Sequence, residues 1–391
     1  MMLAVKRLLA VRDRIIATQS PLPVEEVKLE HAEGRYLASA VTARVAAPPF
    51  TCSAMDGFAV RSVEVTGPVE LPFHASIYAG ASPAPLPPGE AARIFTGAGL
   101  PAGADAVVRE ESVEVTGDRV RFRAAARPGE NVRPAGEDVA AGGEALAAGL
   151  RLGARQLALL SAVGVERVEA VRRPRVAVIS TGDEVVSGRT PDSNGLAVAT
   201  LCRQLGAEVE RVRVPDRLEE VSAVLAAASI LNDAVITIGG VSVGERDLVP
   251  AALRGLGAEL LVHGVPMKPG KPFLFARVEG RPAIGLPGSP SACLVAFEVF
   301  ARPLLLTMAG AAAPFRRALR LRLAEPASGK PGRARLLWAR LTPGGEVAPL
   351  GRDTAQVRGP ALSDALLAIG ADEGELPAGA EVTAWLLDDA W

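Results

Sequence analysis

Three strand patterns with helical patterns between them decide the fold: RVAVIST at 175–181, EVERVRV at 208–214 and DAVITIGG at 233–240. The connecting segments, GLAVATLCRQLG at 195–206 and residues 218–230, have the apolar spacing of amphipathic helices. Strands that alternate with helices indicate a parallel sheet with helices on both faces. The rhythm continues with a helix near 248–257, strands at 259–265, 270–278 and 281–288, and a last helix over about 291–306.

The remaining sequence predicts further units, because 391 residues exceed one ordinary hydrophobic core. We expect a multi-domain α/β plus β fold. Short β-rich runs alternate with turns up to Val139, and period-two patterns such as ALRLRLAEP at 318–326 return near the C-terminus. We also expect residues 140–173 to pack back on the N-terminal helix. The predicted units are a discontinuous helical and extended domain (1–45 and 140–173), an inserted β domain (46–139), the central α/β domain (174–312) and a C-terminal β domain (313–391).

Charge and cysteine usage exclude several classes of protein. The net charge is −1, with 43 basic and 44 acidic residues, which predicts no bulk attraction to nucleic acid or to an anionic membrane. The 3 cysteines and 3 histidines are scattered, so neither a disulfide framework nor a zinc cluster is indicated. The charged N-terminal segment fits neither a signal peptide nor a membrane span, and a cytoplasmic location is expected.

Four loops at predicted strand ends carry polar groups: TGDE at 181–184, GGVSVGERD at 239–247, MKPGKP at 267–272 and GLPGSP at 285–290. An open parallel sheet binds its ligand at such loops. Gly239 and Gly240, with Ser242, outline a phosphate cradle before a helix. An ordinary tight turn is the alternative.

Carboxylates at the same edge suggest a cation. Glu184 and Asp247, with Asp216 less surely, would repel one another unless a hard cation such as Mg²⁺ lay among them. Helix capping is the alternative for each. For Asp216 alone, capping is the preferred interpretation; for Glu184 with Asp247, metal binding is preferred.

A lysine pair stands out in a chain with 38 arginines and only 5 lysines. Lys268 and Lys271 flank a Pro-Gly pair, so a stiff loop would hold two ammonium groups near developing negative charge. A solvated β-turn is the alternative. The GLPGSP turn, with Pro287, Gly288, Ser289 and Pro290, is a second stiff loop before the last helix, whose N-terminal amides could meet another oxyanion.

Taken together, the chain resembles the molybdopterin molybdenumtransferase family, the MoeA proteins and the homologous C-terminal part of gephyrin. The resemblance covers nearly the whole chain and rests on ordered motifs: SAMDGFAV (53–60), IFTGAGLPAGADAVV (94–108), NVRPAGEDV (131–139), VISTGDEVV (178–186), DSNG (192–195) and the three later loops. By spacing alone, the first three motifs indicate only β-turns, because their residue types are common in such turns.

The resemblance implies a MogA-like central domain and a homodimer. It implies that molybdate is inserted into adenylylated molybdopterin with Mg²⁺, releasing AMP and the molybdenum cofactor. The site would lie between the α/β domain of one subunit and the inserted β domain of the other. Molybdopterin adenylyltransferase and recipient molybdoenzymes would be its protein partners. The residues that the motifs carry over are Asp56, Thr96, Asp138, Glu184, Asp247, Lys268 and Lys271.

The sequence departs from the family at several positions. Ser289 replaces an asparagine, Ala292 stands where relatives often have serine, and Trp338 stands where they often have arginine. The linker between TGDEVV and DSNG is also shorter than usual. These departures leave the preference between molybdate and tungstate open. Two other functions also remain open at this stage, adenylyl transfer onto molybdopterin and a gephyrin-like scaffold without catalysis.

Overall fold

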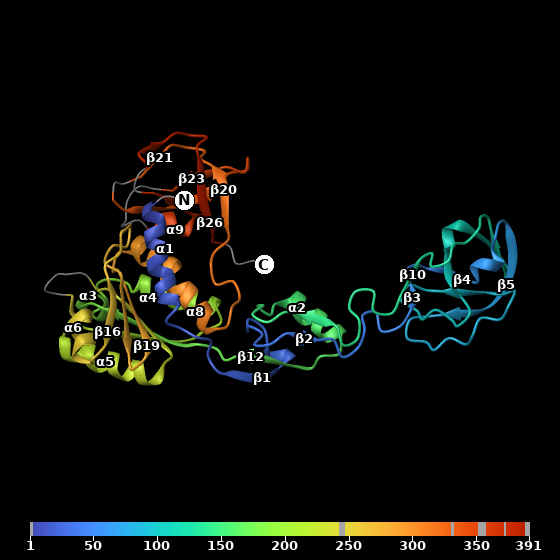
Figure 1. The fold of residues 1–391 in the computed structure, drawn as a ribbon, viewed down its shortest axis with the longest axis horizontal. Helices are drawn as coiled ribbons and strands as arrows, with labels where there is room; N and C mark the ends of the chain where they lie inside the picture. The colour runs from blue at the N-terminus through green and yellow to red at the C-terminus, as the bar shows by residue number, and fades with distance from the viewer. Residues whose placement is uncertain (1–2, 242–246, 330–331, 351–356, 371–372, 388–391) are drawn as a thin grey trace.

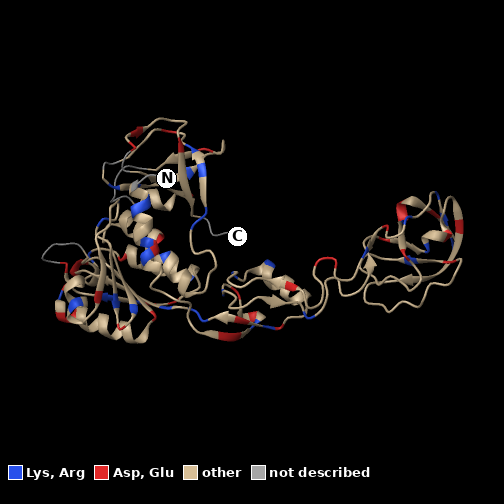
Figure 2. Ribbon diagram, in the orientation of Figure 1, with Lys and Arg blue, Asp and Glu red and all other residues tan. Residues whose placement is uncertain are grey.

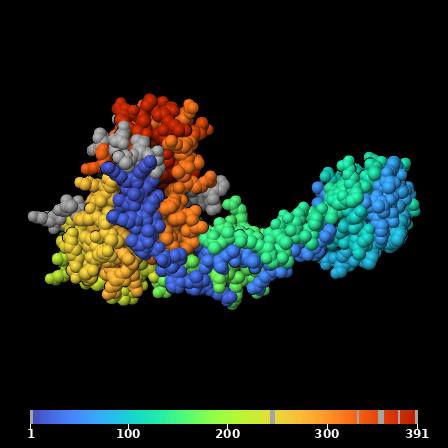
Figure 3. Space-filling view, in the orientation of Figure 1, coloured from blue at the N-terminus to red at the C-terminus, as the bar shows by residue number. Residues whose placement is uncertain are grey.

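The computed structural model describes residues 3–241, 247–329, 332–350, 357–370 and 373–387. Its shape is elongated (Figures 1 and 3): the α/β unit and the C-terminal β unit form a bulky end, a narrow unit follows, and the inserted β unit lies at the far end. Basic and acidic residues are interspersed in every unit (Figure 2).

The central sheet has six strands in the order β14-β13-β15-β19-β18-β16. The four strands from β14 to β19 are parallel neighbours, as the alternating pattern predicted. Strand β18 runs in the opposite direction to the other five and is antiparallel to both of its neighbours, β16 and β19. Glu279 and Gly280, both at positive φ, form the tight turn that joins β18 to β19. The strands are β13 (Arg175–Thr181), β14 (Glu208–Val214), β15 (Ala234–Ile238), β16 (Glu259–His263), β18 (Leu274–Val278) and β19 (Arg281–Leu286).

Helices cover both faces of this sheet, which explains why its inner strands β13, β15 and β19 are buried along almost their whole length. On one face, α5 and α6 bury Val221, Leu225 and Val249 against the sheet. On the other face, α4 and the run α7–η4–α8 bury Val198 and Phe300 in the largest core of the protein. The helices are α3 (Asp183–Val186), α4 (Ser193–Gln204), α5 (Leu218–Leu231), α6 (Leu248–Gly255), α7 (Pro290–Ala296), the π-helix η4 (Phe297–Ala301) and α8 (Arg302–Met308).

Within the described part of the chain, the run Pro290–Met308 is the one helix long and apolar enough to cross a membrane. Its most apolar window is 89% buried inside the protein, as expected for a central core helix. The stacked rings of Phe273 and Phe300, whose centroids are 4.1 Å apart, belong to this core.

The N-terminal helix α1 (Leu3–Ile16) does not pack against residues 140–173, so that part of the sequence prediction is wrong. Its apolar face, Val5, Leu8 and Ile15, is buried in the large core with α8, η4 and strand β22 (Ala334–Leu341). The narrow unit instead forms from strand pairs between its two segments, β1 with β12 and β2 with β11. Its elements are β1 (Val24–Lys28), η1 (Leu29–His31), β2 (Val41–Thr42), β11 (Glu144–Leu146), α2 (Ala154–Ala162) and β12 (Arg167–Val171).

The two β units each have their own sheet. The inserted unit has the order β7-β4-β6-β5-β9-β8, and the pair β3–β10 lies where the chain enters and leaves it. Its elements are β3 (Cys52–Ser53), β4 (Gly57–Val60), η2 (Ser62–Glu64), β5 (Val69–Ile77), β6 (Ala91–Ile94), β7 (Ala106–Arg109), η3 (Glu110–Ser112), β8 (Val113–Thr116), β9 (Arg119–Phe122) and β10 (Val132–Arg133).

The C-terminal sheet has the order β17-β22-β24-β26-β20, and β17 comes from the α/β segment of the chain. The C-terminal sheet is therefore joined to the loop that carries Lys268. The elements are β17 (Met267–Lys268), β20 (Ala318–Arg322), β21 (Ala327–Ser328), β22 (Ala334–Leu341), β23 (Val347–Pro349), α9 (Arg358–Ala361), β24 (Ala365–Ile369), β25 (Glu375–Leu376) and β26 (Glu381–Leu386).

Leu8→Ala tests the docking of α1. The Leu8 side chain is fully buried, so its truncation is expected to lower the free energy of unfolding by about 3 kcal/mol through lost burial and a residual cavity. The measurement is urea denaturation followed by circular dichroism. Lys6→Ala, on the exposed face of α1, is the control and should change stability by less than about 0.5 kcal/mol. Equal effects of the two changes would contradict the docking of α1 in the core.

Candidate functional site at the strand ends

A cavity of about 370 Å³ lies at the carboxyl ends of the central parallel strands. Its wall combines the loops that follow β13, β14, β15 and β19, which is where an open parallel sheet places a ligand. Among the residues that the sequence singled out, the wall contains Glu184, Asp216, Gly239, Gly240, Asp247, Gly288 and Pro290. Ser242 lies outside the described residues.

Of the three acids that the sequence singled out on this wall, Glu184, Asp216 and Asp247, only Asp247 occupies the N-cap position of a helix. Helix α5 has Arg217 rather than Asp216 at its N-cap, and Asp247, at the N-cap of α6, makes no side-chain capping hydrogen bond. Glu184 lies in the short helix α3, with its carboxylate folded against Gly182, where an added Cβ would come within 2.7 Å of Oε1.

These acids do not form a ready-made metal centre. Across the described ranges, no group of three or more His, Cys, Asp or Glu side chains is close enough to hold an ion. The donor chemistry nevertheless fits Mg²⁺, which usually takes one or two protein carboxylates and completes its coordination with water and substrate phosphates.

The backbone conformation after β15 requires glycine at both position 239 and position 240. Both adopt positive φ, +87° at Gly239 and +63° at Gly240, and an added Cβ at either would lie 3.0–3.2 Å from Thr181 Oγ1. The N–H of Gly239 donates to the Leu286 carbonyl oxygen at 3.0 Å. That amide is therefore committed to joining β15 to β19 and is not part of an anion cradle, contrary to the sequence interpretation.

Asp192 is a residue of the cavity that the sequence analysis did not select. It is the N-cap of α4, and only 5% of its side chain is exposed. Its carboxylate accepts hydrogen bonds from Ser180 Oγ at 2.8 Å, from the Gly195 N–H at 2.9 Å and from Arg211 Nη2 at 2.7 Å. Burial alone would raise the pKa of Asp192, but these hydrogen bonds and the charge of Arg211 outweigh it and hold the pKa below its usual range.

The same turn of α4 holds the GLPGSP loop. The side-chain amide of Asn194 donates to the Gly288 carbonyl oxygen at 2.7 Å, and so ties the start of α4 to the loop after β19. The signal in the sequence was DSNG ahead of an apolar helical pattern, which is a typical helix start. Through these bonds, Asp192 and Asn194 connect the start of α4 to β13, to β14 and to the loop after β19.

Comparison with known proteins agrees with this architecture along the whole chain. Residues 4–164 match the family described as MoeA N-terminal region (domain I and II), 177–307 match a probable molybdopterin binding domain, and 320–387 match the MoeA C-terminal region (domain IV). The molybdopterin molybdenumtransferase of Nostoc sp. is 39% identical over 305 residues, covering 74% of this chain and 70% of the relative. The chain belongs to the molybdopterin molybdenumtransferase family.

Two further relatives support this membership. The molybdopterin molybdenumtransferase of Haemophilus influenzae is 36% identical over 301 residues, with 74% of each chain covered. The crystal structure of the molybdopterin biosynthesis MoeA protein from Pyrococcus horikoshii superimposes with a TM-score of 0.78 at 32% identity, covering 98% of this chain and 99% of that one.

The two lysines that the sequence singled out, Lys268 and Lys271, are not among the residues lining the cavity. Lys268 lies in β17, paired with Arg335 of the C-terminal sheet, and the exposed Lys271 follows. Their loop lies beside α7, whose first residue, Pro290, lines the cavity: an added Cβ on Gly270 would lie 3.5 Å from the Ala292 carbonyl oxygen. In the loop before α7, Pro287 is buried and Ser289 is the N-cap without a capping hydrogen bond from its side chain.

Three other residues selected by the resemblance lie away from the cavity. Asp56 immediately precedes β4, in the unit at the opposite end of the molecule (Figure 1). Its Oδ1 accepts hydrogen bonds from the Thr96 N–H at 2.8 Å and from Thr96 Oγ1 at 2.7 Å, and these, helped by the charge of Arg93, lower the pKa of Asp56. The Asp138 carboxylate forms an ion pair with Arg133 Nη2 at 2.9 Å, and Arg133 belongs to strand β10 of the β3–β10 pair.

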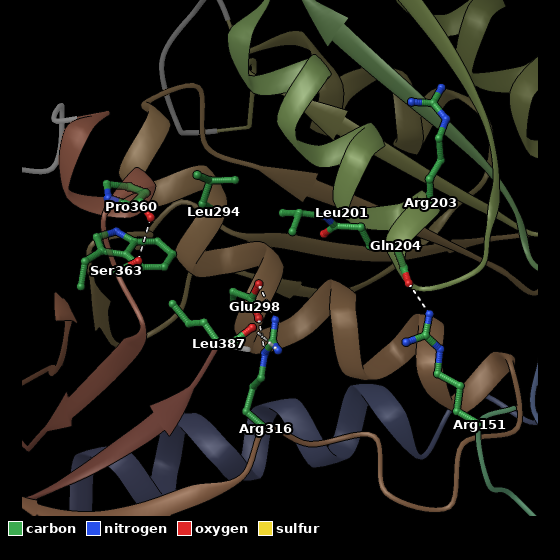
Figure 4. Close-up of a pocket in the computed structure, with 11 residues that line it drawn as sticks. Arg151, Leu201, Arg203, Gln204, Leu294, Glu298, Arg316, Pro360, Ser363 and Leu387 are labelled. Carbon is green, nitrogen blue, oxygen red and sulfur yellow. Dashed lines mark hydrogen bonds and ion pairs between the residues drawn. The ribbon is translucent and has the colours of Figure 1, made fainter. Parts of the chain in front are cut away.

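A second and larger cavity, of about 590 Å³, lies between α4, α7, η4 and the C-terminal sheet (Figure 4). Its charged groups already have protein partners: Arg316 Nε donates to Glu298 at 2.9 Å, and Arg151 Nη2 donates to the Gln204 carbonyl oxygen at 2.9 Å. It has none of the strand-end loops, so the smaller cavity is the better candidate site.

Asp192→Asn tests the buried carboxylate. The variant is expected to lose about 2 kcal/mol of stability at pH 7, the order of a buried hydrogen bond to a charged group. Because the folded pKa is lowered, the contribution of Asp192 is fully present above the unfolded pKa of about 3.9 and is lost as the pH falls through the lower folded value.

Urea denaturation at pH 7 and at successively lower pH measures this difference. The gap between wild type and Asp192→Asn should narrow in acid. Asp13→Asn, at a half-exposed position on α1, is the control and should show almost no gap. A gap that does not change with pH would show that Asp192 is not held as a carboxylate.

Proposed function

We propose that this protein is a molybdopterin molybdenumtransferase, which inserts molybdate into adenylylated molybdopterin and releases AMP and the molybdenum cofactor. The observation that carries the proposal is the arrival of Glu184, Asp216 and Asp247 on the wall of one strand-end cavity in a chain of this family. The alternatives, adenylyl transfer alone or a scaffold, are less favoured, because the match to the family extends through both β units as well as the α/β unit.

Charge explains why this wall suits such a substrate. The substrate contains a pyrophosphate linkage, and phosphate oxygens beside acidic side chains require a cation between them. Mg²⁺ held by Glu184 and Asp247, with Asp216 near, would supply the charge neutralisation that lets AMP leave. Asp192 and Asn194 keep the surrounding loops in place, and the glycines leave room at the sheet edge.

We assign the oxyanion to the neighbouring lysine loop. Lys268 and Lys271 would hold molybdate or the phosphates through their ammonium groups, which act as compact charges. The loop is stiffened by two prolines and adjoins the first turn of α7. We propose that the reaction takes place in the cytoplasm. Tungstate is the alternative to molybdate as the oxyanion.

The second subunit follows from the position of Asp56 and Thr96. Within one chain these residues belong to the unit at the opposite end from the cavity (Figure 1). If they act on the same substrate, a second copy must bring them to it. We therefore propose a homodimer in which each site combines the strand-end cavity of one subunit with the inserted β unit of the other.

Glu184→Gln and Lys271→Ala test the assigned charges. With adenylylated molybdopterin, Mg²⁺ and molybdate, each variant is expected to release AMP at least about 100-fold more slowly than wild type, because each removes a charge that faces the reacting groups. Chromatographic measurement of AMP gives the rate. Glu219→Gln on α5 and Lys28→Ala on β1, both exposed, are the matched controls and should keep wild-type turnover.

Absence of AMP release by the pure wild-type protein would contradict the proposed function. Wild-type turnover in either variant would remove that residue from the site.

Mixing two inactive variants tests the shared site. Asp56→Ala and Glu184→Gln proteins are each expected to be inactive, but subunit exchange makes about half of the dimers mixed, each with one intact site. The mixture should therefore recover about a quarter of wild-type turnover. The control is a mixture of Glu184→Gln with Asp247→Asn, two changes on the same cavity, which should recover none. No recovery in the first mixture would contradict a site made from two subunits.

A further inference from the structure

Strand β22 of the C-terminal sheet makes two separate attachments to the loops around the candidate site. At its start it pairs in parallel with β17, Met267 opposite Ala334 and Lys268 opposite Arg335. The Ala334 N–H donates to the Pro266 carbonyl oxygen at 2.9 Å. The backbone of the lysine loop is therefore part of the C-terminal sheet, although the lysines belong to the α/β segment of the chain.

The second attachment is a buried side-chain hydrogen bond. Trp338, farther along β22, donates its indole N–H to Ser291 Oγ at 2.8 Å. Both residues are buried, with 7% of Trp338 and 3% of Ser291 exposed. Ser291 is the second residue of α7 and directly follows the Gly288–Ser289–Pro290 turn.

The two attachments act from one rigid strand. Successive side chains of a strand alternate between faces, so Ala334, Leu336 and Trp338 share one face, and all three are buried in the large core with Met267. The lysine loop also lies beside α7, because an added Cβ on Gly270 would lie 3.5 Å from the Ala292 carbonyl oxygen. Strand β22 therefore fixes the distance between the lysine loop and the first turn of α7.

We propose that Trp338 and Ser291 are positioning residues for oxyanion binding: their hydrogen bond holds the turn before α7 in register with the lysine loop. Neither side chain touches the substrate. An unpaired indole N–H or an empty acceptor in this buried place would let the first turn of α7 shift against Lys268 and Lys271. This inference rests on the proposed function, because it assigns the lysine loop to the oxyanion.

The experiment is a double-mutant cycle with Trp338→Phe, Ser291→Ala and the double variant. Phe keeps an aromatic ring but removes the N–H donor together with part of the indole volume, and Ala removes the hydroxyl that accepts the bond. Each single change is expected to raise KM for molybdate by roughly five- to tenfold, the equivalent of one hydrogen bond, with kcat at saturating molybdate changed less than about twofold. The double variant should be no worse than the poorer single variant, because both remove the same bond.

Trp385→Phe is the matched control, since Trp385 is in the same sheet, on β26, and takes no part in either attachment. It should keep the wild-type KM. Melting temperatures measured for all variants identify a purely structural role. An unchanged KM for molybdate in both single variants, whatever their melting temperatures, overturns the proposal, and so do additive effects in the double variant.

Tryptophan fluorescence separates failure of this inference from failure of the proposed function. Molybdate added to Trp385→Phe protein should change the emission, and the change should be lost in Trp338→Phe/Trp385→Phe and weakened in Ser291→Ala/Trp385→Phe. If wild-type protein releases no AMP but this pattern holds, the proposed reaction fails and the positioning role stands. A molybdate response that persists without Trp338, or no response at millimolar molybdate, overturns the positioning role.

Discussion

The parallel pairing of β13, β14, β15 and β19 is the constraint on which the rest of the structure depends. Parallel strands end at the same edge of their sheet, so loops that are far apart in sequence meet there without any specific side-chain contact. Glu184, Asp216 and Asp247 reach one cavity for this reason. Helices on both faces hold the strands in place, and the carboxyl-end edge of the sheet holds an open cavity.

Polar contacts then set the shape of that edge. The Asp192 carboxylate joins the end of β13 to the start of α4 and to Arg211 of β14, and Asn194 joins α4 to the loop after β19. The C-terminal sheet adds a third support through β17 and the Trp338–Ser291 bond. The cavity is thus shaped by buried hydrogen bonds from several elements, and Glu184, Asp216 and Asp247 lie on its wall.

The sequence predicted those strands and motifs whose signal lies in neighbouring residues. The strand RVAVIST coincides with β13 at Arg175–Thr181, because apolar β-branched residues and the following glycine mark both its identity and its end. Motif order was enough to predict the family. Long-range packing was not predictable: α1 carries an amphipathic pattern that does not say which surface it covers, and it lies on α8 rather than on residues 140–173. The pairing of β17 with β22 was missed because two residues give no strand signal of their own.

The same limit applies to the site. Carboxylates at strand ends could be foreseen, but the role of Asp192 depends on partners at positions 180 and 211, and the Gly239 amide is already used by the backbone. On the proposed function, cavity carboxylates and a cation bind the nucleotide phosphate together. Calorimetric titration of AMP with and without Mg²⁺ measures whether they do. We expect at least tenfold tighter binding with Mg²⁺ in wild type and no such gain in Asp247→Asn; equal affinities with and without Mg²⁺ would show that the cavity does not bind phosphate through a cation.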